Sequence, residues 1–421
     1  MNKRIIIHNP FYEDWFGNFN LYKFLTRRKS HPKYSYIFEY FIKSRKQNVI
    51  IYIDLSQNSF INNKKLHKLK LTHLVTLVEF FLWCLLNRVN IFKQKIIFNL
   101  NHIQSEDIFL SNSYHNLDIN ERVSYLEPLK SIKTAFILQH SFADTEFISL
   151  NAKKLNIDYL IAENNLSKNS AYFKKYFKWY EKDIYHIPYV FKSRFKNIKP
   201  FKDRKNICFA TGSFEHLSDH PRYSTFKNFF NTQTIHPMRK IIYDNLHELK
   251  DLINSKISDL YKDEVERLHE GDNLFQKIYA RLFNAMFVKQ SNYHKFDIVA
   301  EYNDAKMFVV PEEANDLPGI GFVEGMACGS AYIGLDDRMY KDIGLIPGKH
   351  YITYDGTLED LKSKIIYYQN NNDELEAIAL AGCNFVRKNF NGNSVAKKFY
   401  NDLLSDELKS SFTKKYLTLY N

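Results

Sequence analysis

Residues 304–334 read DAKMFVVPEEANDLPGIGFVEGMACGSAYIG and hold most of what the sequence shows about the fold. Met307–Val310 is a short apolar run typical of a buried strand, and Pro311 ends it. An acidic, glycine-bearing loop follows, then a short helix that Gly329 ends, and a second strand begins at Ala331. This order predicts an α/β sheet of parallel strands, with the loop at the carboxyl end of one of them.

The same alternation of strands and helices extends along the whole chain. Continuous runs of Ile, Val, Tyr and Phe favour parallel strands that are covered on both faces. The predicted strands are Ile5–His8, Val49–Asp54, Ile96–Leu100, Ala135–Gln139 and Tyr159–Ala162, and then Ile207–Ala210, Met307–Val310, Ala331–Gly334 and Tyr351–Tyr354. The predicted helices cover residues 238–266, 274–289, 358–370, 374–389 and 394–405.

A polar, basic stretch at residues 192–205 divides the two series of strands. It contains Pro200 and lacks apolar periodicity, as expected of a linker. We therefore predict an N-terminal Rossmann-like domain at residues 1–195, a C-terminal one at 206–400, and a helical tail at 401–421 that packs back on the N-terminal domain. Both domains are expected to be doubly wound and to face a central cleft, where ligands bind at the carboxyl ends of strands.

Composition excludes several classes of protein. The chain has 421 residues, of which 45% are hydrophobic and 25% are charged, so it is not disordered as a whole. Its 4 cysteines form no Cys-x-x-Cys pair, which disfavours zinc ribbons and fits a reducing compartment. Neither a signal peptide nor an apolar run of ~20 residues is found, so a cytoplasmic location is expected. The net charge of +12 suits an anionic partner or reflects a biased genome.

The acidic and glycine positions of the loop resemble the donor-binding motif of GT-B glycosyltransferases, in particular the group-1 and CgeB-like families of bacterial polysaccharide synthesis. That motif has an acidic residue, Gly three positions later, Glu eight positions after the first acid, and then Ala-Met-Ala-x-Gly. The corresponding residues here are Asp316, Gly319 and Glu324, followed by residues 325–329, Gly-Met-Ala-Cys-Gly. Two departures are Asp in place of the usual Glu, and Pro318 where Phe is common.

The resemblance implies a role for each residue of the loop. Glu324 is expected to bind the ribose hydroxyls of a nucleotide sugar, and Asp316 to contact the transferred sugar or support its anomeric centre. The N–H groups of Gly319, Ile320 and Gly321 are expected to face the diphosphate or the sugar. The spacing of the two acids favours retention over inversion of the anomeric configuration.

A diphosphate leaving group also needs positive charge, which GT-B enzymes usually supply from side chains rather than from a metal. The candidates follow a strand that contains Gly212, which is itself expected to contribute to donor binding. Arg239, beside a predicted helix start, is the first choice and Lys240 is its neighbour; Arg222 and Lys227 are alternatives. No Asp-x-Asp triplet is present, so no metal is expected.

The N-terminal domain supplies the acceptor-side predictions. His140 directly follows a predicted strand and is a candidate to orient a hydroxyl or the donor sugar, or else a histidine satisfied by a nearby carbonyl. Asn9 and Gly17 lie in the loop after the first strand, where the acceptor is expected to approach. His216 and His220 have a spacing that suits a metal, but their surroundings indicate a loop.

Residues 64–88 combine basic and apolar side chains. Lys64, Lys65, Lys68, Lys70 and Arg88 accompany Leu, Val, Phe and Trp. This composition fits a helix on a membrane surface, as a lipid-linked acceptor requires, and it also fits a helix packed in the core.

The function expected from the residues and the resemblance is transfer of a sugar. The donor is a nucleotide-diphosphate sugar, UDP- or GDP-linked, and the acceptor is a glycan or a lipid-linked glycan of a bacterial capsule or lipopolysaccharide. No cofactor and no nucleic acid are expected, and the location is the cytoplasm, at the inner face of the membrane. The alternatives are a nucleotide-sugar epimerase on the same fold and a non-enzymatic basic protein that binds membrane or RNA.

Overall fold

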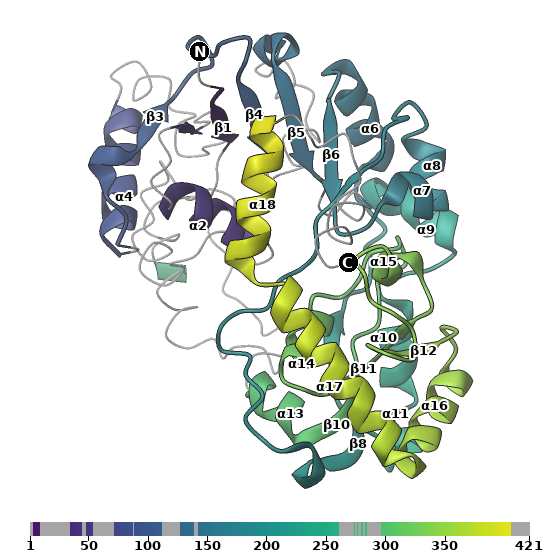
Figure 1. Cartoon of the computed structure of the whole chain (residues 1–421). Coiled ribbons are helices and arrows are strands. Elements are labelled where there is room, and N and C mark those ends of the chain that lie inside the picture. The colour runs from purple at the N-terminus through teal and green to yellow at the C-terminus, as the bar shows by residue number, and fades with distance from the viewer. Residues whose placement is uncertain are drawn as a thin grey trace. The chain divides into compact units, whose positions relative to one another are not determined.

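The computed structural model describes residues 3–8, 34–43, 48–53, 71–86, 88–111, 127–138, 142–260, 273, 276, 279–280, 283 and 296–405. The chain divides into two compact units (Figure 1). The first unit comprises Met1–Val190 together with Asn389–Asn421, and the second comprises Phe191–Lys388. Each unit contains one parallel sheet with helices, which confirms the predicted class of two Rossmann-like α/β domains.

The sheet of the first unit has seven parallel strands in the order β3-β2-β1-β4-β5-β6-β7. Their bounds are β1 Ile5–His8, β2 Val49–Tyr52, β3 Lys95–Ile97, β4 Ile108–Ser111, β5 Lys133–Ile137, β6 Tyr159–Ala162 and β7 Tyr185–His186. The order reverses between β1 and β4, as in other doubly wound sheets. β4 was not predicted, because it contributes only three consecutive apolar residues, Ile108 to Leu110, between polar neighbours.

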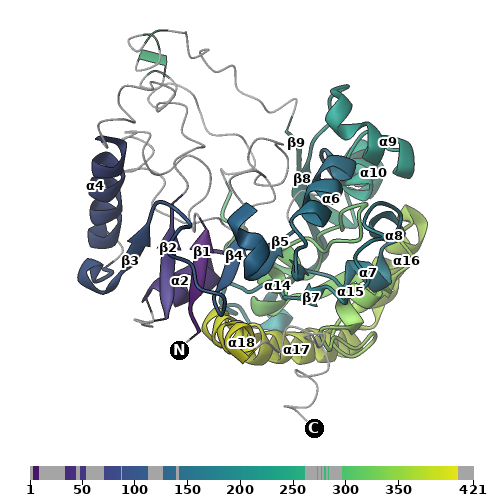
Figure 2. The ribbon, with the colours of Figure 1, turned by 90° about the horizontal axis from the view of Figure 1, so that it is seen from above.

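The helices of the first unit are α2 Ser35–Lys43, α4 Leu71–Leu86, α6 Thr145–Lys154, α7 Leu166–Asn169, α8 Ala171–Tyr176 and α18 Gly392–Ser405, with 3-10 turns at Ile91–Lys93 and Glu127–Ser131. α18 runs beside α2 and returns the end of the described chain to this unit (Figure 1). In the shared core Phe41 of α2 stacks on Phe399 of α18, with ring centroids 6.1 Å apart. α4 lies beside β3, which is an edge strand of this sheet (Figure 2).

The sheet of the second unit has five parallel strands in the order β12-β11-β10-β8-β9. The strands are β8 Lys205–Phe214, β9 Ile253–Asp259, β10 Ala305–Val309, β11 Ala331–Leu335 and β12 Ile352–Tyr354. The helices are α9 Ser224–Phe230, α10 Pro237–Asp244, α11 Leu246–Leu249, α13 Ile298–Asp304, α14 Gly321–Ala327, α15 Arg338–Lys341, α16 Leu358–Asn370 and α17 Asn372–Asn389, with 3-10 turns at Phe201–Asp203 and Pro221–Tyr223.

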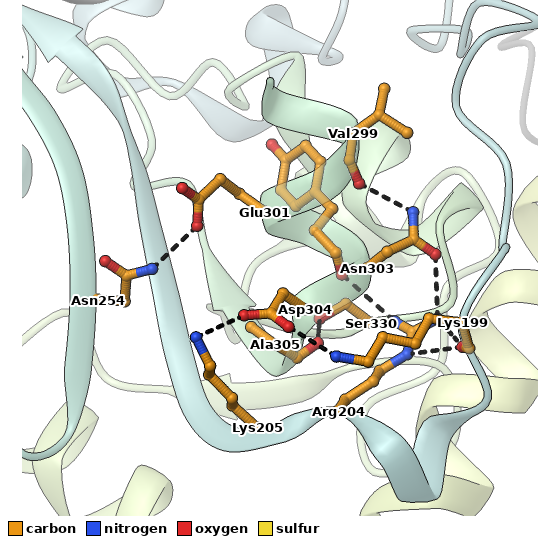
Figure 3. A network of polar contacts seen from close by, with 11 residues as sticks. Lys199, Arg204, Lys205, Asn254, Val299, Glu301, Asn303, Asp304, Ala305 and Ser330 are labelled. Atoms are coloured by element: carbon orange, nitrogen blue, oxygen red, sulfur yellow. Dashed lines mark hydrogen bonds and ion pairs between the residues drawn. The ribbon is translucent and has the colours of Figure 1, made fainter. Parts of the chain in front are cut away.

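A polar network joins the chain before β8 to the amino end of β10 (Figure 3). Lys199 Nζ donates to Asp304 Oδ1 at 2.6 Å, and Lys205 Nζ lies 2.8 Å from Asp304 Oδ2. Arg204 donates to Asn197 Oδ1 at 2.7 Å and to the Lys199 carbonyl at 2.9 Å. These bonds hold residues 196–205 on the second unit, so the stretch predicted to link the domains packs with the C-terminal one.

One predicted helix is wrong. Residues 238–266 contain α10, α11 and then β9 rather than a single helix. The sequence of β9, INSKISD, lies at the sheet edge and is apolar only at Ile253 and Ile257, four positions apart as on a helix face, and this hid the strand among helical patterns. The predicted helix at 274–289 lies almost wholly outside the described residues. None of the helices in the described ranges has the length and apolar content needed to cross a bilayer.

Candidate active site

The loop between β10 and α14 is fixed by main-chain bonds at both ends. Glu313 N donates to the Leu317 carbonyl at 2.8 Å and closes a tight turn, and Ala314 N donates to the Ile235 carbonyl at 2.8 Å, just before α10. Within this turn Asp316 has φ of +63°, in the left-handed region. Asp and Asn adopt that region far more readily than most other residues, which gives a local reason for Asp where the related motif has Glu.

The glycines of the loop are required by close packing on the end of β10. An ideal Cβ on Gly319 would lie 2.7 Å from Val310 Cγ1, and one on Gly321 would lie 2.7 Å from Tyr302 Oη and 2.9 Å from Val310 Cγ2. Tyr302 Oη donates to the Gly321 carbonyl at 3.3 Å. Backbone can approach this closely only without a side chain, so the glycines set the position of the loop against the strand.

Arg239, in the first turn of α10, lies between two of the predicted glycines. Its Nε donates to the Pro311 carbonyl at 3.0 Å and its Nη1 donates to the Ser213 carbonyl at 2.8 Å, so it joins the carboxyl ends of β10 and β8. An ideal Cβ on Gly212 would lie 2.9 Å from Nε, and one on Gly319 would lie 3.0 Å from Nη2. The guanidinium is therefore held rigidly, and its Nη2 is directed at the loop.

Glu324 lies in the first turn of α14, which is buried along its whole length. The side chain is 9% exposed, and no hydrogen bond from the described part of the chain reaches its carboxylate. Burial raises its pKa to about 7, although the positive charges of Lys192 and Arg194 oppose the rise. A desolvated carboxylate with unused acceptor capacity is suited to bind ligand hydroxyl groups.

The other predicted site residues lie near the loop between β10 and α14, elsewhere on α10, or outside the described residues. Ile320 is half-buried just before α14. The ammonium of Lys240 pairs with Asp244 one turn along α10, on the partly exposed side of that helix. His140, Asn9 and Gly17 lie outside the described residues. The structure thus brings Arg239, Gly212 and Gly319 into contact, with Asp316, Ile320, Gly321 and Glu324 on the same connection from β10 to α14.

Three titratable side chains beside the loop were not predicted. His236 Nε2 lies 4.0 Å from Glu313 Oε1. Glu215, just after β8, has a pKa raised by its burial and by the charge of Glu313. The cluster forms because β8, β10 and the turn before α10 meet at one edge of the sheet, and no local sequence pattern marks such a meeting.

Glu312 was read from sequence as part of the acidic loop, but it is a buried residue of the fold. Its Oε1 accepts hydrogen bonds from Tyr340 Oη at 2.6 Å, Tyr332 Oη at 3.1 Å and Leu335 N at 3.1 Å. The two tyrosines come from β11 and α15, and the signal that could have found the cluster is the buried Tyr332 between apolar neighbours in β11.

The two candidate metal-binding histidines were also located. His216 Nε2 lies 3.6 Å from Asp259 Oδ2, and His220 accepts a hydrogen bond from Arg222 N at the start of a 3-10 turn. Within the described ranges no group of three or more His, Cys, Asp or Glu side chains could hold a metal ion. The four cysteines are free and buried.

Comparison with known proteins gives one family and several related folds. Residues 274–401 match the family described as glycosyl transferase-like. HepE from Anabaena, solved with UDP and glucose, aligns over 96% of this chain and 100% of its own, with 10% identity and a TM-score of 0.50. Sucrose-phosphate synthase from Thermosynechococcus elongatus aligns over the same shares, also with 10% identity and a TM-score of 0.50.

Among curated proteins, the Arp2/3 complex-activating protein RickA from Rickettsia rickettsii is 30% identical over 147 residues. The match covers 35% of this chain, and the chain spans about a quarter of the length of that relative, 27%. The two-sheet architecture, the loop from β10 to α14 and the family match agree with one another. The chain therefore has the GT-B fold, and its residues 274–401 are similar to the glycosyl transferase-like family.

Proposed function

We propose that the protein is a glycosyltransferase that takes a sugar from a nucleotide-diphosphate donor bound by the second unit. The observation that carries this proposal is Glu324, a buried carboxylate in the first turn of α14 that accepts no hydrogen bond from the described chain. Keeping such a group desolvated costs stability, and a ligand that donates two hydroxyl groups would offset the cost. A ribose has two adjacent hydroxyl groups of this kind.

Two cations of α10 and the loop between β10 and α14 complete the proposed donor site. Arg239 and the N–H groups of residues 319–321 would stabilise the negative charge that develops on the diphosphate as it leaves. Lys240 is the second proposed cation, and would first have to leave Asp244. Asp316 is proposed to contact the transferred sugar, and His140 to orient the reacting groups from the first unit.

The donor class is supported by the solved relatives. HepE has been crystallised with UDP-glucose, and that complex aligns over 96% of this chain with 12% identity and a TM-score of 0.50. We propose a UDP- or GDP-linked sugar as donor, and a glycan or lipid-linked glycan of a bacterial surface polysaccharide as acceptor. Such an acceptor would bring the enzyme to the inner face of the membrane, and contact through residues 64–88 belongs to the same proposal.

We also propose that sugar transfer needs no metal ion and that the transferred sugar retains its anomeric configuration. Arg239 is already held in place by two main-chain carbonyls, so its charge would be available without the reorganisation that a mobile lysine requires. Transfer should persist in excess chelator. Loss of transfer in chelator, with recovery on adding manganese or magnesium, would contradict the proposed role of these cations.

Thermal unfolding in the presence of UDP, GDP, their sugar conjugates and adenine nucleotides tests the donor site. A ligand at ~100 times its dissociation constant stabilises by ~2.7 kcal/mol, which is easily measured. We expect one uracil or guanine nucleotide to stabilise the wild type clearly more than Glu324→Gln, and to stabilise the control Glu376→Gln, an exposed glutamate of α17, as it does the wild type. Absence of stabilisation by every nucleotide would overturn the proposal.

Product analysis separates this function from the two alternatives. Transfer requires the acceptor, whereas an epimerase converts the nucleotide sugar without one. A non-enzymatic nucleic-acid-binding protein would instead show RNA affinity that falls steeply with salt.

A further inference from the structure

Helix α4 of the first unit exposes a continuous apolar stripe. Leu74, Leu77, Val78, Phe81 and Leu85 are each 41% to 59% exposed. At 3.6 residues per turn these five positions fall within an arc of about 100° on the helix surface. A helix that packed only into the core would expose polar side chains over that arc.

The other side of α4 packs normally. Phe80 and Cys84 are buried in a core cluster with Ile51 of β2, with Ile53 just after that strand, and with Val89 after the helix. This packing fixes the orientation of the helix, so the exposed stripe is a property of the folded unit and not of a detached helix. Among the described side chains of residues 71–86, one group is therefore buried in the core and another is exposed and apolar.

Apolar exposure is concentrated at this place. Phe92, in the 3-10 turn after α4, is 95% exposed. Together with the stripe it makes 6 of the 14 large apolar side chains that are exposed among the described residues, and all six fall within residues 74–92. Patches of this kind mark interaction sites, whereas single exposed apolar residues are ordinary.

The charges around the stripe indicate what it meets. Arg88, Lys93 and Lys95 follow the helix and are exposed. Over residues 62–95 the sequence has seven Lys or Arg and one acid, Glu79. An apolar helix face bordered by cations is the pattern of a helix that lies in the interface of an anionic bilayer.

We propose that the α4 surface, defined as the five stripe residues with Arg88, Phe92, Lys93 and Lys95, binds the surface of a bilayer that contains anionic phospholipid. A second copy of the chain is disfavoured, because two such surfaces would bring like charges together. The proposal deepens the proposed function, since it names the surface that would bring a transferase to a lipid-linked acceptor, but lipid binding itself needs no donor.

Sedimentation of the full-length protein with vesicles tests the proposal. The vesicles contain phosphatidylcholine alone or with 30% phosphatidylglycerol as the probe lipid. We expect binding to the anionic vesicles and at least tenfold weaker binding to the neutral ones. Leu74→Gln/Val78→Gln/Phe81→Gln should lower binding at least tenfold, because it removes the apolar contact. The matched control is Leu150→Gln/Ile366→Gln/Leu380→Gln, three exposed apolar residues elsewhere, which should bind as the wild type does.

A second pair of variants tests the charges. At about 1 kcal/mol per cation near an anionic surface, Lys93→Gln/Lys95→Gln should weaken binding roughly 25-fold. Lys153→Gln/Lys154→Gln, two exposed lysines of α6, should leave it unchanged.

Three results would overturn the proposal: no binding of the wild type to anionic vesicles, equal binding to both vesicles, or an α4 triple variant that binds as the wild type does. A wild-type dimer that the triple variant converts to a monomer, without vesicle binding, would assign the surface to a second copy. Vesicle binding is measured without nucleotide. Failure of every nucleotide to bind would therefore overturn the proposed function and leave this result standing.

Discussion

Glu312 and Glu324 are both buried glutamates of the second unit, in the same connection between β10 and β11, yet they have opposite surroundings. Glu312 is 6% exposed and accepts three hydrogen bonds, two from tyrosine hydroxyls and one from the main chain. Glu324 is 9% exposed and accepts none from the described residues. Burial alone therefore does not mark a functional carboxylate. We propose that the acceptor capacity left unused after folding marks Glu324 as the functional one.

The pKa values follow from these surroundings. Burial raises the pKa of both carboxyls, and for Glu312 the hydrogen bonds it accepts oppose the rise. The pKa of Tyr332 and Tyr340 is raised well above 10 by burial and then by the charge of Glu312. We propose that Glu312 serves the fold and Glu324 the donor site, and the following changes test that proposal.

The largest effect is expected from Glu312→Ala. It would remove the acceptor of two buried tyrosine hydroxyls and the Leu335 N–H, at about 1–3 kcal/mol for each group left unsatisfied. The two hydroxyls lie 2.7 Å apart, so one of them can still donate to the other. We expect the free energy of unfolding of the second unit to fall by about 3–5 kcal/mol in a urea titration. Glu312→Gln, which keeps one acceptor oxygen, should lose clearly less. A loss below 1 kcal/mol for Glu312→Ala would mean that this cluster is not what holds the loop.

Glu324→Gln should have the opposite effect on stability. Glutamate in the unfolded chain titrates near 4.5, and Glu324 in the folded chain near 7. Below pH 4.5 both states are protonated and burial of the carboxyl costs no ionisation energy. Between pH 4.5 and 7 the unfolded state ionises first, so the free energy of unfolding falls by about 3 kcal/mol and stays lower above pH 7.

Glu324→Gln removes that loss, so the variant should be about 3 kcal/mol more stable than the wild type at pH 8 and equally stable at pH 4. Unfolding free energies at the two pH values check this, with Glu376→Gln as the control for an exposed glutamate of the same unit. Parallel pH profiles for wild type and Glu324→Gln would contradict the desolvated state of this carboxyl.

A smaller effect is expected from Gly319→Ala. The added Cβ would meet Val310 Cγ1 at 2.7 Å and Arg239 Nη2 at 3.0 Å. Overpacking of this kind costs about 1–3 kcal/mol, and displacement of the guanidinium should also weaken nucleotide binding. If Arg239 transmits the effect, then Gly319→Ala in an Arg239→Lys background should weaken binding by less than the sum of the two single changes. Additive losses would show that the loop and Arg239 act independently.

The sequence predicted much of the fold because parallel strands are short continuous apolar runs. Ile5–His8 and Tyr159–Ala162 were predicted with the observed bounds. β9 was missed because it is a mostly polar edge strand whose two isoleucines are four positions apart, and local pattern does not distinguish it from a helix surface. The predicted domain boundary at residue 195 differs from the division at Val190, because the bonds of Lys199 and Arg204 are made with residues about 100 positions away.

The candidate site could be predicted only in part, for a similar reason. Glu324 and the glycines stand out by their spacing, and the contact of Arg239 with Gly212 and Gly319 fits its selection beside a helix start. The acceptors that hold Arg239, the carbonyls of Ser213 and Pro311, belong to strand ends that only the folded sheet brings together. From the sequence, Glu312 was read only as part of the acidic loop, because its partners Tyr332 and Tyr340 lie 20 and 28 residues away.

The most direct test of the central claim is a calorimetric titration at pH 8 of UDP and GDP into the wild type, Glu324→Gln and Glu376→Gln. If Glu324 holds the ribose, the charge-assisted hydrogen bonds it accepts are worth about 1.5–3 kcal/mol. Glu324→Gln should then bind the preferred nucleotide about 10- to 100-fold more weakly than the wild type while being the more stable protein, and Glu376→Gln should bind as the wild type does. Equal affinity of Glu324→Gln and the wild type would contradict the account.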